Sequence, residues 1–468
     1  MVRDAELAKV ADLGAYDTLD VLFKGRGTFI PLEKPAVLIL CKHYSSINAG
    51  VPVSILHLML KYGANVRSER GKFNILQIAA AEGNDAAMST IVSLAPDFLD
   101  SIGELDLAPL HIACENGHAK AVEKLLDLGA RIDVQSRDGS LPILFAAGAA
   151  QAECIRVLAR RGAKVNVVTE VLPRSSPPKY KSSPLYCTTS SSEPGRMAAM
   201  EALLACGADV NYAFGTQWRP IHRAAVLGDV AALQLFLKHG VELHTPLTNP
   251  DEYSRTALHK AVMFGQLDFV RSLVLAGINL NVKDGLGKTA VLIALQTNQL
   301  DMVKLLVDLK ADDCIADDEG VSPVIYAAMK DMGQAILLLR AYALKEASIS
   351  APSVPAANAL QVAAQMGHRK VVVAILFHFP DLWFTSPGSL DVSVRQMAHV
   401  RGHSLVVNVL DEVLAKAKEI EREWRRCGYM RCGYISSTMI REAMRKHELF
   451  KRFKLVDAVF WGKSVSEN

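Results

Sequence analysis

A six-residue block recurs through most of this chain at a nearly constant interval. The blocks start 33 to 42 residues apart, at Asn74, Ala108, Leu141, Ser183, Arg219, Thr256, Thr289, Ser322, Asn358 and Ser393. A period of this length is typical of repeat architectures, in which each unit buries its apolar face only against its neighbours. A stack of repeats, rather than several independent globular cores, therefore accounts for a chain of 468 residues.

Other residues keep fixed places within each interval. A glycine lies nine positions after the block start at Gly83, Gly117, Gly228, Gly265, Gly367 and Gly402, and a Gly-Ala turn closes several intervals at Gly129, Gly162 and Gly207. Proline is the second residue of several blocks, as at Pro109, where a helix start tolerates the missing N–H. Glycine is common just after a helix end. Each interval is therefore predicted to form a helix–turn–helix unit.

This pattern resembles the ankyrin repeat, which opens with Thr-Pro-Leu-His-x-Ala and has a period of about 33 residues. The segment from Ala108 to Asp133 matches almost position for position, and the resemblance covers about 34–410. It implies an all-α-dominated solenoid of ten to eleven helix–turn–helix units with short β-hairpin fingers. We expect an N-terminal cap at 1–33, the solenoid at 34–410 and a basic helical extension at 411–468.

Three departures from the pattern predict solvent-exposed loops. The range 168–182 is a Ser/Pro/Lys-rich insertion in a finger, Thr188–Pro194 lengthens a turn between helices, and Thr245–Arg255 is a second long finger. The repeat pattern weakens after about 340.

Composition excludes several classes of protein. The net charge of +3 gives no chain-wide reason to expect nucleic acid as a partner. The longest apolar run, of about nine residues, is shorter than the roughly 20 that a membrane span requires, and the first residues have no apolar signal-peptide core. Eight sparse cysteines predict reduced thiols and a cytoplasmic or nuclear location, or both.

Motifs that could carry chemistry are incomplete. Gly285-Leu-Gly287-Lys288-Thr289 is similar to the end of a phosphate-binding loop, but Val282 stands where that motif requires glycine, and the stretch also fits a finger. The fourth block place holds His111, His222 and His259, which we interpret as buried hydrogen-bonding residues that tie one repeat to the next. Cys427 and Cys432 are either two ordinary thiols or part of a zinc site with His447. We expect no enzyme activity, cofactor or metal.

The resemblance implies that partners bind at finger tips and on the first helix of each pair. The finger candidates are Arg137, Phe214, Trp218, Tyr253, Arg255, Lys283 and Lys288, and the fifth block place adds Arg223, Lys260 and Tyr326. We hypothesise that Trp218, Arg223, Tyr253, Arg255 and Lys260 together face the groove and bind an acidic, partly apolar peptide. The alternative is that the cations are solvated and Trp218 packs on its own finger.

Two residues are candidate modification sites. Asn211 resembles the position that an asparaginyl hydroxylase modifies in ankyrin repeats, with Leu203 eight residues before it and Asp209 two before; the alternative is that Asn211 caps the finger through its own backbone. Ser176 precedes a proline in the insertion and fits a proline-directed kinase, so that phosphate there would regulate access to the groove.

The range 422–463 is strongly basic, with eleven Lys/Arg against four Asp/Glu and a net charge of +7. Met439 to Leu455 is a basic amphipathic stretch that could seal the last repeat, bind a partner or an anionic surface, or act as a nuclear signal. Overall we expect a non-enzymatic scaffold or adaptor that binds a partner protein on the concave ankyrin surface, with no small-molecule substrate. The alternative is nucleic-acid or anionic-surface binding through 422–463. Ubiquitin-ligase adaptor, signalling scaffold and transcriptional regulator remain open as roles.

Overall fold

The computed structural model describes residues 75–102, 106–168, 183–213, 218–247, 253–339, 354–378 and 389–426. Within these ranges the chain is built of helices and turns, with no strand. The chain divides into two compact units. Unit 1 comprises residues 1–224 and 229–242, and unit 2 comprises 225–228 and 243–468.

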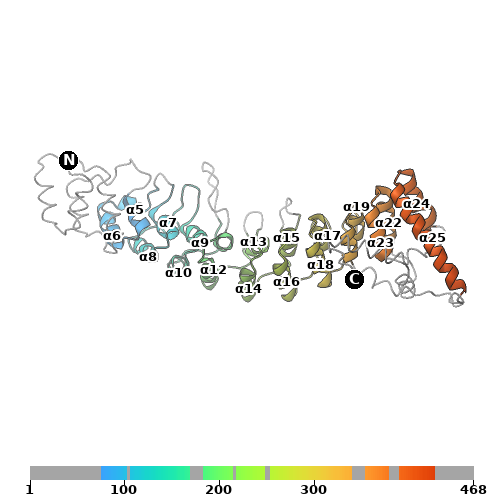
Figure 1. Ribbon diagram of the computed structural model, residues 1–468. Helices are drawn as coiled ribbons and strands as arrows, with labels where there is room; N and C mark the ends of the chain where they lie inside the picture. Colours follow the sequence, from blue (N-terminus) through green and yellow to red (C-terminus); the bar gives the residue numbers. More distant parts are fainter. Residues whose placement is uncertain are drawn as a thin grey trace, which may run out of the picture. The chain divides into compact units, whose positions relative to one another are not determined.

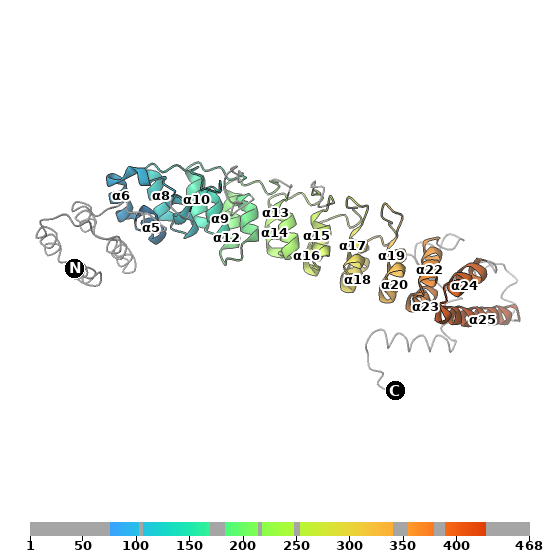
Figure 2. The same ribbon diagram turned by 90° about the horizontal axis from the view of Figure 1, so that it is seen from above.

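Unit 1 consists of helix pairs in two rows. The helices are α5 (Ile75–Glu82), α6 (Asp85–Leu94), the 3-10 turn η1 (Pro96–Phe98), α7 (Pro109–Glu115), α8 (Ala119–Asp127), α9 (Pro142–Gly148), α10 (Ala152–Arg160), α11 (Pro184–Ser190), α12 (Arg196–Ala205) and α14 (Val230–Lys238). The first helices α5, α7, α9 and α11 pack each on the next (Figure 1). The second helices α6, α8, α10 and α12 form the other row (Figure 2).

Unit 2 repeats this arrangement. Its helices are α15 (Ala257–Met263), α16 (Leu267–Leu275), α17 (Ala290–Gln296), α18 (Leu300–Asp308), α19 (Pro323–Met329), α20 (Gly333–Leu338), α22 (Val354–Met366), α23 (Arg369–His378), α24 (Ser389–Val400) and α25 (Ser404–Arg426). The first helices α15, α17, α19, α22 and α24 pack in that order. Helix α13 (Pro220–Leu227) begins in unit 1 and ends in unit 2. The solenoid of helix–turn–helix units predicted from the sequence is confirmed.

Small and aliphatic residues form the core between neighbouring helices. Ala113 and Ala146 are fully buried in α7 and α9, so the two helices can approach closely. On α8, Val122 and Leu125 are buried and Leu126 is half-buried, as the three- and four-residue spacing predicts. Enlarging a side chain in such a contact typically costs about 1–3 kcal/mol, because a close-packed core has no room for it.

The blocks mark the helix starts well in the first eight intervals and less well in the last two. Each of the first eight begins on the residue immediately before its helix, as Ala108 does before Pro109. Helices α22 and α24 start four residues before their blocks, at Val354 and Ser389. The pattern therefore weakens after about 340, as the sequence predicts.

The fingers are tighter than the β-hairpins that the resemblance implies. Three described finger tips are turns, closed by backbone hydrogen bonds from Ser136 to Ser140 at 3.0 Å, from Asp284 to Lys288 at 2.9 Å, and from Asp317 to Val321 at 3.2 Å. A second backbone bond lies inside each turn, from Gly139 to Ser136, Gly287 to Asp284 and Gly320 to Asp317. The described fingers contain no strand, which corrects the expectation of hairpin strands there.

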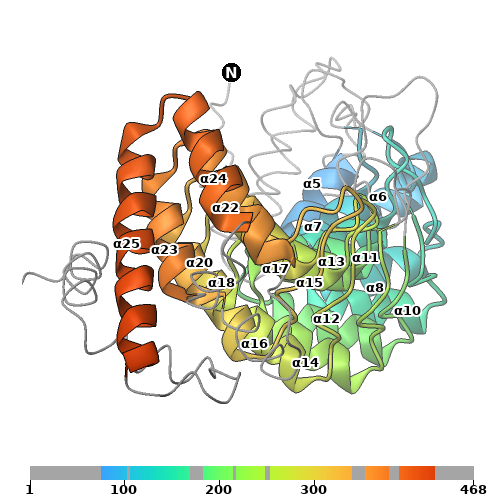
Figure 3. The same ribbon diagram turned by 90° about the vertical axis from the view of Figure 1, so that its right-hand side faces the viewer.

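The C-terminal helix continues past the last repeat. Helix α25 packs on α23 and α24 (Figure 3) and includes the helix predicted to begin at Asp411. The predicted boundary between 410 and 411 falls inside this single helix. No described helix combines the length and the apolar character needed to cross a membrane. Several predictions lie outside the described residues, namely the cap at 1–33, Phe214, Ser176, Cys427, Cys432 and the chain after Arg426.

Candidate partner-binding surface

The repeated histidines connect helix starts to fingers. His111 Nδ1 accepts the N–H of Ala108 at 3.1 Å, and its Nε2 lies 3.0 Å from the carbonyl oxygen of Ser140. His259 Nδ1 accepts the N–H of Thr256 at 3.1 Å, and its Nε2 lies 3.0 Å from the carbonyl oxygen of Val282.

Burial favours the uncharged form of both rings. It lowers the pKa of His111 to about 4 and also lowers the pKa of His259. A neutral ring with its proton on Nε2 satisfies both contacts, because Nδ1 then accepts and Nε2–H donates. The interpretation of these residues as buried hydrogen-bonding links is confirmed for His111 and His259.

The Gly-Leu-Gly-Lys-Thr stretch forms a finger turn organised by Asp284. One carboxylate oxygen of Asp284 accepts the N–H groups of Leu286 and Lys288, each at 2.9 Å. Gly287 has φ +72°, in the left-handed region that glycine tolerates. A phosphate-binding loop needs free backbone N–H groups that face the phosphate. Here two of them already bind a carboxylate, so the interpretation of the stretch as a finger is confirmed.

Two of the described cysteines, Cys114 and Cys154, offer little reactivity. Cys114 and Cys154 are fully buried, and burial raises the pKa of both thiols, that of Cys154 to about 12. A thiol held protonated in this way is a poor nucleophile and a poor metal ligand. Asp312, Asp313 and Cys314 place three possible metal-ligating atoms within 4.8 Å of one another. They are consecutive residues of one turn, in which the Cys314 N–H donates to Asp312 at 3.0 Å.

An aromatic and basic cluster lies on unit 1 where α11 and α13 begin. The ring of Trp218 meets Tyr186 edge to face at 6.4 Å and His222 at 6.2 Å. Arg223 donates from Nε to the hydroxyl of Ser190 at 3.1 Å. Trp218, Tyr186 and Arg223 are all half-buried. Their positions are therefore fixed by packing while part of each side chain stays accessible to a partner.

The predicted finger cations are largely paired with acids. Arg137 lies 2.8 Å from Asp106, and Lys283 lies 3.8 Å from Asp318. Both pairs are exposed, and exposed pairs contribute little to stability. They nevertheless reduce the positive charge that an acidic peptide would meet, so the basic surface is weaker than the sequence suggests.

Arg255 is held more firmly. It lies over the ring of Tyr253, 5.1 Å from its centroid, and its Nε is 3.5 Å from a carboxylate oxygen of the fully buried Asp284 side chain. Only 15% of the Arg255 side chain is exposed, whereas Tyr253 is exposed. At this finger a partner would meet the tyrosine ring rather than the guanidinium group.

Lys260 corrects the expectation for the fifth block place. Lys260 is only 4% exposed, and the residues at the same place in other repeats, Ile112, Phe145, Cys187 and Ile293, are buried too. This place faces the neighbouring helices, and the aliphatic residues that fill it elsewhere were the sequence signal for its burial. Ile78, Arg223, Tyr326 and Val362 are half-buried at this place, and Met397 is exposed there.

The five residues of the predicted patch belong to two compact units. Trp218 and Arg223 lie in unit 1, whereas Tyr253, Arg255 and Lys260 lie in unit 2. The burial of Lys260 excludes it from such a groove, and the hypothesis that the other four residues face one groove stays a prediction. Lys288 is half-buried in its finger turn.

Sequence reasoning missed a row of exposed apolar side chains on unit 2. They lie at or near the C-terminal ends of first helices and comprise Phe264, Met329, Met366 and Val400, to which the exposed Met397 adds from the fifth block place of α24. Apolar residues at the eighth and ninth block places were the available signal, because the last turn of a first helix has few neighbours to cover it.

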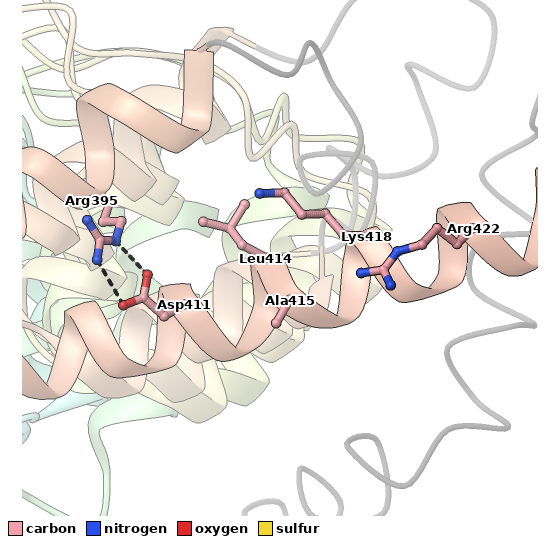
Figure 4. Close-up of a pocket in the computed structure, with 6 residues that line it drawn as sticks. All are labelled: Arg395, Asp411, Leu414, Ala415, Lys418 and Arg422. Atoms are coloured by element: carbon pink, nitrogen blue, oxygen red, sulfur yellow. Dashed lines mark hydrogen bonds and ion pairs between the residues drawn. The ribbon is translucent and has the colours of Figure 1, made fainter.

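A second surface feature lies between α24 and α25. Arg395 forms a two-point ion pair with Asp411, which lowers the pKa of that carboxyl group. Leu414, Ala415, Lys418 and Arg422 continue the same side of α25 (Figure 4). Together they line an open hollow of about 460 Å³. One end of the hollow is basic and includes Arg422, the first residue of the range 422–463.

Asn211 is a structural link between repeats. Its amide donates to the carbonyl oxygen of Gly240 at 3.2 Å and accepts the N–H of Glu242 at 2.8 Å. Asn166 makes the same two bonds with Gly207 and Asp209. The expectation that Asn211 caps the finger through its own backbone is therefore corrected, because its side chain binds the backbone of the next repeat. Hydroxylation of Asn211 stays a prediction.

Comparison with known proteins agrees with this architecture. The family described as ankyrin repeats (3 copies) matches residues 76–169, 190–284 and 275–353, together more than half of the chain. The chain belongs to the ankyrin-repeat family. Ankyrin repeats are in general protein–protein interaction modules, and this is the kind of domain that the described surfaces form.

Two curated relatives share the repeats, and this chain covers less than a fifth of the length of each. The chain is 25% identical over 317 residues to E3 ubiquitin-protein ligase KEG of Arabidopsis thaliana, covering 53% of this chain and 19% of that protein. It is 28% identical over 240 residues to the ankyrin repeat and KH domain-containing protein mask-1 of Caenorhabditis elegans, covering 51% of this chain and 8% of that protein. The crystal structure of the human ASB11 ankyrin repeat domain covers 51% of this chain and 99% of its own, with 22% identity and a TM-score of 0.43.

Proposed function

We propose that this chain is a non-enzymatic scaffold or adaptor that holds a partner protein on its fingers and first helices. The observation that carries the proposal is the cluster of Tyr186, Trp218 and Arg223 on unit 1. Tryptophan, tyrosine and arginine are the residues that most often dominate binding energy at interfaces. Because packing already fixes their positions, these three side chains would lose little conformational entropy when a partner binds.

Three described residues of types that serve in catalysis, His111, His259 and Asp284, have structural roles. The neutral His111 and His259 connect fingers to helices, and the Asp284 carboxylate organises a turn. Substrate recruitment for a ubiquitin ligase is one role open to such an adaptor, and the relative named E3 ubiquitin-protein ligase KEG makes it worth testing.

The test is quantitative affinity capture with the full-length chain, followed by mass spectrometry. Trp218→Ala combined with Arg223→Glu is expected to reduce recovery of specific partners at least tenfold. Leu275→Gln is the matched control, because Leu275 is 89% exposed on the second helix α16 and should leave recovery unchanged. Hydrogen exchange of α11 and α12 checks that unit 1 stays folded. If the folded double variant recovers the same proteins, this surface is not the binding site.

A second candidate function is binding of an anionic surface or nucleic acid through the C-terminal basic region. It is supported by the basic end of the hollow at Lys418 and Arg422, where the range of net charge +7 begins. Binding to phosphatidylserine vesicles or to DNA should then weaken steeply between 50 and 200 mM salt, because each contact with an anionic group releases counterions. Affinity that does not change with salt would contradict this function.

A further inference from the structure

Three consecutive first helices of unit 2 expose apolar side chains on one face. The face is defined by Met329, Lys330, Met366, Met397, Val400 and Arg401, which lie at the ends of α19, α22 and α24. Helix α19 packs on α22, and α22 packs on α24, so the six residues form one surface, called here the α19–α24 face. Val400 is 75% exposed and Met366 is 47% exposed.

The same places in unit 1 are polar or small. The ninth block place holds Glu82, Asn116 and Ala149 there, whereas in α22 it holds Met366. The eighth place holds Met329 in α19 and Val400 in α24. The repeat itself therefore does not require apolar side chains at these places. Clustered exposed apolar residues of this kind mark interaction sites.

The face is hollowed between α22 and α24. Gln365, Gln396, Met397, Val400 and Arg401 line an open hollow of about 440 Å³. Its lining combines two amides and a guanidinium group with two apolar side chains. An apolar side chain with a hydrogen-bond acceptor near it would suit this lining. Methionine also adapts to the shape of a partner, since its unbranched side chain can adopt many conformations.

The charges on the face indicate what occupies it. Lys330 and Arg401 occupy equivalent ninth places and are exposed, and neither forms an ion pair with a described residue. Asp331, next to Lys330, is the one acid beside them at the end of α19. The range 422–463, with its net charge of +7, would be repelled here, and a second copy in a symmetric contact would bring a like-charged face.

We propose that the α19–α24 face binds an amphipathic helix of a partner protein that carries an apolar stripe flanked by Asp and Glu side chains. The stripe lies along the methionines and Val400, and the carboxylates pair with Lys330 and Arg401. Recognition of an amphipathic helix through spaced apolar anchors is a common mode of peptide binding. The inference rests on the proposed scaffold function and adds the chemistry of one partner.

The test uses two designed 18-residue helices labelled with fluorescein, and fluorescence anisotropy with the full-length chain. Both helices carry the same leucine stripe, and the flanking residues are Glu in one and Lys in the other. The Glu helix should bind at least tenfold more tightly than the Lys helix. Lys330→Glu with Arg401→Glu should reverse this preference, and Met366→Gln with Val400→Gln should weaken both helices. Leu275→Gln is the control and should change neither.

Several outcomes would overturn the inference. Absence of Glu-helix binding, equal binding of the two helices, or a preference that survives the charge reversal would each do so. Displacement of the Glu helix by a synthetic peptide of residues 439–455 would assign the face to the chain's own basic segment. Self-association that is lost on Met366→Gln would assign it to a second copy.

The inference and the proposed function can fail separately. If partner capture depends on Trp218 and Arg223 while the Glu helix does not bind, the scaffold function stands and this site is rejected. If the Glu helix binds as described and capture is unaffected at Trp218, the proposed unit 1 site is rejected and this one stands.

Discussion

The buried His111 should make the stability of its repeat depend on pH. The ring has a pKa of about 4 in the folded chain, against an ordinary value of 6.5 when unfolded. A group whose pKa is lowered by folding stabilises the protein above its unfolded pKa, and that contribution is lost as the pH falls from 6.5 toward 4. At pH 5.5 the unfolded ring is about ten-elevenths protonated while the folded ring is still neutral. The loss relative to pH 7.5 is therefore about 1.4 kcal/mol, or roughly tenfold in the opening equilibrium.

The chain provides both a probe and a control for this effect. Cys114 lies in the same helix as His111 and is fully buried, so its rate of labelling by 4,4′-dithiodipyridine reports how often α7 opens. Gln77 occupies the equivalent place in α5 and donates through its amide to the carbonyl oxygen of Leu107 at 2.5 Å. His111→Gln should therefore keep the bond to Ser140 while removing the titrating group.

The prediction concerns the difference between the two proteins. After correction for the reactivity of a model thiol, opening at Cys114 should rise about tenfold more in wild type than in His111→Gln between pH 7.5 and 5.5. Peptide mass spectrometry separates Cys114 from the other cysteines. If both proteins show the same pH dependence, the neutral buried histidine is not the source of it, and the reasoning from burial is wrong.

Three further predictions test single contacts between repeats. Asp229→Ala removes the cap on the Ala232 N–H at 3.1 Å and the ion pair with Arg196. The free energy of unfolding of unit 1 in urea should therefore fall by about 1–3 kcal/mol, and by less in Asp229→Asn, which keeps the cap. Asn211→Ala should cost about 1–2 kcal/mol and speed hydrogen exchange at the Glu242 N–H, whereas Asn211→Asp should leave that N–H protected. Gly287→Ala should destabilise unit 2 in thermal unfolding, because a Cβ at Gly287 would lie 2.5 Å from the backbone N of Asp318. Gly162→Ala is the control in unit 1 and should destabilise less, since a Cβ there meets nothing within 4 Å and costs only the roughly 1–2 kcal/mol of left-handed backbone.

The sequence predicts the residues that each repeat needs for stacking. The role of His111 follows from its recurrence at the same place as His259, because a polar residue that recurs inside an apolar block needs a recurring partner. The sequence predicts a finger around Lys288 in the same way, because Lys288 directly precedes the block that starts at Thr289. These features repeat because every interface between units has the same geometry.

Side-chain partners that differ from repeat to repeat were not predictable in this way. Arg255 and Asp284 are 29 residues apart, and nothing in either finger alone indicates that the carboxylate is buried beneath the guanidinium group. The isoleucines at the fifth block place in other repeats indicated that Lys260 is buried. A lysine there suggested an exposed cation, although a long aliphatic stem can be buried along apolar neighbours.

The places that stacking leaves unconstrained are the ones that can specify a partner. Six of the ten blocks hold His or Gln at the fourth place, where Gln77, His111 and His259 bind the backbone of the next finger. At the ninth place the residue changes from Glu82 and Asn116 in unit 1 to Met366 and Arg401 in unit 2, although the helix ends there in a similar way. A substitution at the fourth place should therefore act through stability, and one at the ninth place through affinity. The two kinds of place separate fold from recognition within a single repeat.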